Sequence, residues 1–167
     1  MQRYKDVKPF RHMIMKKLLY LLMLLPLAML GGCHDDDDIP DVNVSISLSD
    51  VVVDGNVIYT VKDTPLKITS ISVQGVGSRA LVTSVAYYWN GVRIGWNPIA
   101  PFSATIAGAL VPEGNHVLGI SMEVAQEGKA LGFCATTYNV KAVENEDALP
   151  EGTEPGPATI TYTGSPE

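Results

Sequence analysis

The chain has few cysteines and few histidines, and this shortage excludes whole classes of site. Among its 167 residues are two cysteines, Cys33 and Cys134, and three histidines. Zinc sites need several Cys or His ligands at short spacing, and no such cluster is present. No glycine-flanked serine elbow occurs either, which is the usual mark of one large hydrolase class. The sequence therefore predicts no catalytic residue, no metal site and no cofactor.

Basic residues are also scarce. From Cys33 onward, six Lys and Arg accompany 17 Asp and Glu, giving a net charge of −11. Nucleic-acid binding needs Lys and Arg gathered on one surface to replace counterions. The six here are scattered along the chain: Lys62, Lys67, Arg79, Arg93, Lys129 and Lys141. The sequence therefore excludes a nucleic-acid partner.

No apolar run is long enough to span a bilayer. The longest runs for 13 residues, from Leu18 to Leu30, which is short of the roughly 20 that a membrane helix needs. It follows a basic head at Lys16 and Lys17, and its length fits the apolar centre of about 7–15 residues in a secretory signal. We predict a signal peptide over residues 1–32. Residues 1–14 are polar and come before a more suitable initiator methionine, which indicates an error in the assigned start site.

The signal ends at Leu30-Gly31-Gly32-Cys33. This segment resembles the lipobox of bacterial lipoproteins, which has an aliphatic residue, two small residues and a cysteine. The resemblance implies that Cys33 carries a diacylglycerol thioether, becomes the mature N-terminus and receives a further amide-linked chain. Several acyl chains give stable membrane anchoring, so the resemblance implies a membrane partner held through lipid alone.

An acidic leader over residues 33–41 follows. Its four consecutive carboxylates are Asp35, Asp36, Asp37 and Asp38. Like charges repel and keep such a segment extended and solvated, so one interpretation is a spacer. The run also resembles an acidic export signal of Gram-negative gut-bacterial lipoproteins, which implies the outer face of the outer membrane. A calcium loop fits less well, because calcium loops interleave ligands with glycine and a distal glutamate.

Residues 42–143 read as short strands separated by turns. Apolar and polar residues alternate with a period of two from Val42 to Leu48 and from Leu118 to Val124, a pattern typical of half-buried strands. Asn90-Gly91 indicates a two-residue hairpin turn, in which both positions need positive φ. About seven or eight strands at this spacing predict an all-β fold, a β-sandwich.

Three segments strengthen this prediction: residues 85–95 (VAYYWNGVRIG), 100–102 (APF) and 113–118 (EGNHVL). They resemble bacterial immunoglobulin-like domains, which share an aromatic strand end, an Asn-Gly hairpin and a Gly-x-His corner. The resemblance implies an immunoglobulin-like topology and a corner-capping role for His116. One departure is that Cys134 has no partner once Cys33 is lipidated, so no intramolecular disulfide can form. Cys134 is predicted to be a buried small hydrophobe; a catalytic thiol would need a base, and His116 is the only histidine in the globular part, residues 42–143.

Residues 144–167 form an acidic tail rich in Pro and Gly, a composition that buries little apolar surface. Residues 158–163 alternate and could add one further strand. The sequence does not decide whether this strand docks.

Aromatic residues are the one feature that suggests a ligand. If Tyr87 and Trp89 fill the core, alternation turns Tyr88 outward, and Trp96 lies in a segment rich in Pro and Gly. Tyr and Trp rings are common in binding surfaces, so Tyr88 and Trp96 are the candidate binding residues. We expect a non-catalytic, lipid-anchored cell-surface binding or adhesion module for a glycan or protein partner. A structural subunit of a surface assembly is the alternative, and an enzyme is the third.

Overall fold

The structure is a computed structural model that describes residues 39–164. Nine strands form it, with two short 3-10 turns at Gly108–Leu110 and Glu146–Ala148. The strands are β1 (Val42–Asp54), β2 (Val57–Val61), β3 (Leu66–Gly75), β4 (Ala80–Trp89), β5 (Val92–Asn97), β6 (Ala104–Ile106), β7 (Gly114–Gln126), β8 (Gly132–Val143) and β9 (Gly156–Gly164). The predicted signal peptide, Cys33 and Asp35 to Asp38 lie outside the described residues.

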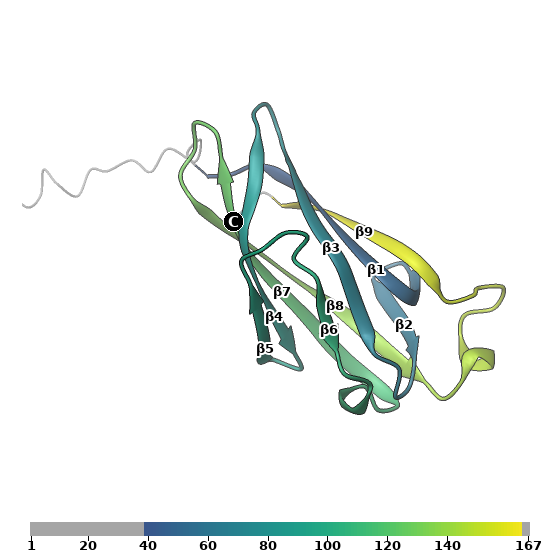
Figure 1. Cartoon of the computed structure of the whole chain (residues 1–167). Coiled ribbons are helices and arrows are strands. Elements are labelled where there is room, and N and C mark those ends of the chain that lie inside the picture. The colour runs from purple at the N-terminus through teal and green to yellow at the C-terminus, as the bar shows by residue number, and fades with distance from the viewer. Residues whose placement is uncertain (1–38, 165–167) are drawn as a thin grey trace, which may run out of the picture. The chain divides into compact units, whose positions relative to one another are not determined.

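The strands lie in two layers that share β1 (Figure 1). One layer has the order β9-β1-β3-β6, and the other has the order β5-β4-β7-β8-β2. The last residues of β1, from Val52 to Asp54, pair with β2 and join the layers. All pairs are antiparallel except β2 with β8. The predicted all-β, immunoglobulin-like sandwich is confirmed, with eight strands between residues 42 and 143 and β9 in addition.

The core lies between the layers and follows the alternation in the sequence. On β7, Leu118, Ile120, Met122 and Val124 are all buried, and on β4 so are Val85, Tyr87 and Trp89. Burial of Tyr87 raises the pKa of its phenol to about 12, and its hydroxyl donates a hydrogen bond to the Phe102 carbonyl. Cys134 is buried as predicted. Within the described residues, no helix is long and apolar enough to cross a membrane.

Trp89 packs against a histidine ring in the core. The Trp89 and His116 rings stack with centroids 5.0 Å apart. The Trp89 Nε1–H donates to the Leu110 carbonyl at 2.8 Å. His116 Nε2 lies 2.7 Å from the Pro112 carbonyl oxygen, which holds the corner before β7. The corner-capping role that the family resemblance implies for His116 thus matches its contacts.

The end of the sandwich where the chain enters is held by a buried polar residue, Gln126. Its Oε1 accepts the Asp41 N–H at 2.7 Å, and its Nε2 donates to the Val76 carbonyl at 2.9 Å. Pro40 packs against Gly132 so closely that a Cβ there would lie 2.6 Å from the proline ring. Because Val42 pairs with Gly164, the first and last strands meet at this same end.

The β4–β5 hairpin turns at Asn90 and Gly91 as predicted. Their φ angles are 50° and 81°, the positive values that a type I′ turn requires. Asn90 also extends the hydrogen bonding between β4 and β7, because its Oδ1 accepts the Val117 N–H at 2.9 Å.

Gly91→Val should lower the free energy of unfolding by about 1–3 kcal/mol, because a β-branched residue is strained at this φ. No heavy atom lies within 4 Å of a Cβ placed at Gly91, so the loss would come from the backbone alone. Urea denaturation measures the loss of stability. Gly55→Val, in the exposed turn after β1, is the matched comparison because Gly55 also has a positive φ (57°) and open space around it. An unchanged midpoint in Gly91→Val would contradict the turn assignment.

Candidate binding face

The outer face of the layer β5-β4-β7-β8 carries both predicted binding residues. Because residues opposite one another in paired strands point to the same side, the register settles their placement. Trp96 on β5 lies opposite Ala86 on β4, and Arg93 lies opposite Tyr88. Tyr88 and Trp96 are therefore diagonal neighbours on one face. A bulge between Tyr87 and Tyr88 brings Arg93 rather than Ile94 beside Tyr88.

Tyr88 is half-buried rather than fully exposed. The reason lies on β7, where Gly119 is its cross-strand partner. A Cβ at Gly119 would lie 3.1 Å from the Tyr88 Cβ and 3.8 Å from its Cδ2. The Tyr88 side chain therefore covers the space that the glycine leaves, a pairing known to support sheets. This contact restrains the ring, which lowers the entropy cost of binding a ligand against it.

A shallow groove of about 330 Å³ runs beside Tyr88. Its floor consists of small residues on β7 and β8, namely Gly119, Ser121, Ala135 and Thr137. No charged residue lines it. An aromatic wall over a small, hydroxyl-bearing floor suits a neutral ligand that has flat apolar faces and hydroxyl groups.

Trp96 lines a different groove. This second groove, of about 260 Å³, lies between β5 and β6 and is also lined by Asn97, Ser103 and Thr105. The Trp96 side chain is 56% exposed. The structure thus places both aromatic residues on one face but does not bring them into one groove. A ligand in contact with both must cross from β4 to β5.

Two further apolar residues on this face were not among the predicted binding residues. Phe133 on β8 is 69% exposed and lies opposite Glu123, and Val117 on β7 is 41% exposed. The exposure of Phe133 could have been predicted from the sequence, because successive side chains of a strand point to opposite faces and Cys134 was expected to be buried. Trp96 and Phe133 stand on β5 and β8, three strand spacings apart, which is roughly 14 Å.

His116 and Cys134, the base and the thiol that the sequence offered, are both engaged in the fold. The Pro112 carbonyl can only accept, so His116 Nε2 carries the proton, and Nδ1 is left to accept from Asn90 Nδ2 at 3.2 Å. Burial raises the pKa of the Cys134 thiol, which disfavours the reactive thiolate. Across residues 39–164, no group of three or more His, Cys, Asp or Glu is placed to hold a metal.

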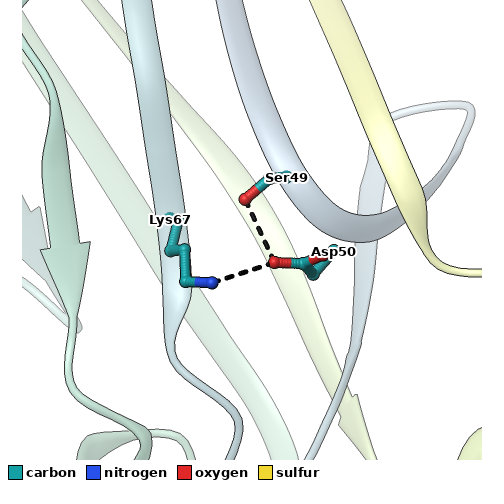
Figure 2. A network of polar contacts seen from close by, with 3 residues as sticks. All are labelled: Ser49, Asp50 and Lys67. Atoms are coloured by element: carbon teal, nitrogen blue, oxygen red, sulfur yellow. Dashed lines mark hydrogen bonds and ion pairs between the residues drawn. The ribbon is translucent and has the colours of Figure 1, made fainter.

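A groove of about 480 Å³ lies away from this face and has acidic lining residues, among them Asp50, Glu146 and Glu154. Figure 2 shows that Asp50 already has partners, with Lys67 Nζ at 3.1 Å and Ser49 Oγ at 3.2 Å. The hydrogen bond from Lys67, followed by that from Ser49, lowers the pKa of Asp50. Asp50 and Lys67 are both exposed, and exposed pairs contribute little to stability.

Comparison with known proteins gives little further information. No family model matches the chain, and no curated protein matches it. Among solved structures, the chain is similar to the fibronectin(III)-like modules of Clostridium thermocellum CbhA, with 15% sequence identity and a TM-score of 0.38. The match covers 62% of this chain and 46% of that one, so the chain spans under half the length of the structure it matches.

Proposed function

We propose that this chain is a non-catalytic binding module that captures an extended glycan on the outer face of the β5-β4-β7-β8 layer. The observation that carries the proposal is the Tyr88 ring, held over Gly119 beside an uncharged groove. Sugar rings have apolar faces that stack on aromatic rings and hydroxyls that hydrogen-bond to polar neighbours. Ser121 and Thr137, whose side chains carry hydroxyl groups, are among the residues that line the same groove.

The spacing of the aromatic residues favours a chain of sugars over a single ring. Tyr88 and Trp96 line separate grooves, and Phe133 stands further across the face, on β8. A monosaccharide can cover one of these rings but not several. An oligosaccharide that crosses the strands contacts two or three of them, and contacts at separate subsites add to affinity through effective concentration.

Binding of the Cys33→Ala chain to a broad glycan array tests this proposal. We expect retention on neutral oligosaccharides of several units and little on the matching monosaccharides. Binding confined to anionic glycans would contradict the assignment to an uncharged groove. No binding to any glycan, by a chain whose circular dichroism shows a folded β protein, would reject the glycan and leave a protein partner as the alternative.

The location that we propose is the cell surface, at the outer membrane, with Cys33 as the lipid anchor and Asp35 to Asp38 as the export signal. The lipobox resemblance and the acidic run support this proposal. A binding face on a lipid tether would then be presented to material outside the cell.

Cys33→Ala should move the protein out of the membrane fraction, because the acyl chains are its only proposed anchor. Fractionation followed by immunoblotting measures the change, and a higher apparent mass identifies any variant chain that keeps its signal peptide. A processed variant retained in the membrane would contradict lipid anchoring. Cys134→Ala, which alters the buried thiol, serves as the control.

A further inference from the structure

Strand β9 is joined to the sandwich by one strand only. It pairs with β1 from Val42↔Gly164 to Val51↔Gly156, and it pairs with no other strand of the described chain. Its inward side chains, Ala158, Ile160 and Tyr162, pack on the core but are only partly buried. All of its strand pairing lies on one edge, so its release breaks no other strand pair. Such a terminal element can open locally at a lower free energy than the whole domain, and β9 can therefore leave while the rest stays folded.

The segment before β9 has the properties of a hinge. Leu149 is a fixed point, because it is buried against Val52 and Val143. After it, residues 150–155 are held by a turn in which Thr153 N–H and Oγ1 both donate to the Pro150 carbonyl, at 3.2 and 2.6 Å. Among the described residues, these six make no hydrogen bond to the sheets. Extended, they span up to roughly 20 Å.

The site that β9 would vacate cannot remain uncovered without cost. It is the edge of β1, where Val42, Val44, Ile46 and Leu48 are almost completely buried. Exposure of this edge would leave both apolar surface and unpaired backbone groups in water. A replacement strand must therefore present apolar residues at the alternate inward positions, as β9 does with Ala158, Ile160 and Tyr162.

We propose that the replacement is β9 of a second copy, so that two copies exchange their last strands. The fit of this strand to β1 is already known, because the exchanged form repeats the β1–β9 pairing of the unexchanged one. No charged residue lies between Gly156 and Gly164, so the exchanged strand brings no carboxylate onto a chain of strong negative charge. A reciprocal exchange closes as a two-fold dimer. The exchange is independent of glycan binding, because β9 lies outside the β5-β4-β7-β8 layer.

The hinge predicts a dependence on salt. In a two-fold exchange the two hinge segments cross, and each carries Glu151 and Glu154. Repulsion between them opposes dimerisation at low ionic strength and is screened as salt rises. We therefore expect the dimer fraction to increase with added salt.

Cysteine pairing between copies tests the exchange. Ser47 and Thr159 are direct partners in the register, and their side-chain oxygens lie 3.4 Å apart, a geometry suited to a disulfide. The full chain with Cys33→Ser and Cys134→Ala serves as background. One preparation adds Ser47→Cys and another adds Thr159→Cys, and the two are mixed at high salt under mild oxidation.

We expect a disulfide-linked heterodimer on a non-reducing gel, because the two introduced thiols meet between copies only when β9 of one lies on β1 of the other. The matched control mixes Ser47→Cys with Thr163→Cys, whose native partner is Asn43, and it should give a several-fold lower yield. Equal yields from the two mixtures would mean random collision and would overturn the proposal. Disulfide dimers of Thr159→Cys alone, in excess of the heterodimer, would overturn it too by placing β9 against β9.

Discussion

Trp89→Ala should lower the free energy of unfolding by about 3–5 kcal/mol, the usual cost of removing a large core aromatic. Trp89 is 5% exposed, so its loss leaves a cavity between the layers. The change also removes the stacking partner of His116 and the donor to the Leu110 carbonyl. Core packing and two contacts at the corner before β7 are therefore lost together, and urea denaturation followed by circular dichroism measures the effect.

Trp96→Ala is the matched control, because the residue type is the same and the side chain is 56% exposed. Substitutions at such positions usually change stability by no more than about 0.5 kcal/mol. The fold assignment thus predicts a large difference between two identical chemical changes. Similar losses in both variants would contradict the placement of Trp89 in the core and Trp96 on the outer face.

The period-two alternation was sufficient to predict which side chains of β4 and β7 enter the core. Burial of Leu118 to Val124 on β7, and of Tyr87 and Trp89 on β4, follows from the pattern within each strand. The turn at Asn90 and Gly91 follows from local conformational preference, since few residues tolerate positive φ. Both are local properties, which one sequence can reveal.

The candidate site depends on which strands lie side by side, and this was not predictable. Tyr88 was expected to face water, but its half-burial comes from Gly119, 31 positions further along the chain and opposite it on β7. The separate grooves of Tyr88 and Trp96 depend in the same way on the neighbours β7 and β6. The hydrogen bonds of the Gln126 side chain join three segments of the chain, and no local sequence pattern predicts them.

Docking of β9 was open for the same reason. Its alternation is clear, but alternation does not identify a partner strand. The structure pairs it with β1, more than 100 positions earlier, where Thr163 Oγ1 donates to Asn43 Oδ1 at 3.0 Å.

The double variant Tyr88→Ala and Trp96→Ala should abolish glycan binding while it leaves the domain folded. Tyr88 contributes one cross-strand contact with Gly119, and such contacts contribute about 0.2–1 kcal/mol. Trp96 is mostly exposed, so the variant should melt close to the wild type. A binding hot spot, by contrast, contributes about 2 kcal/mol or more, which corresponds to at least about a 30-fold loss of affinity.

A second double variant, Val76→Ala and Leu131→Ala, controls for the loss of exposed apolar surface. Val76 is 48% exposed and Leu131 is 55% exposed. Both lie in loops, outside the strands that carry the binding face. This control should bind as tightly as the wild type, which would show that the effect belongs to the two rings on the outer face.

Titration of the best neutral oligosaccharide from the array into the three Cys33→Ala chains, by calorimetry, tests the binding face most directly. The predicted result is equal affinity for the wild-type face and the Val76/Leu131 control, and at least about a 30-fold loss for the Tyr88/Trp96 variant with its melting temperature nearly unchanged. Unchanged affinity in the folded Tyr88/Trp96 variant would contradict the proposed face. Unfolding of that variant would show instead that the two rings belong to the core.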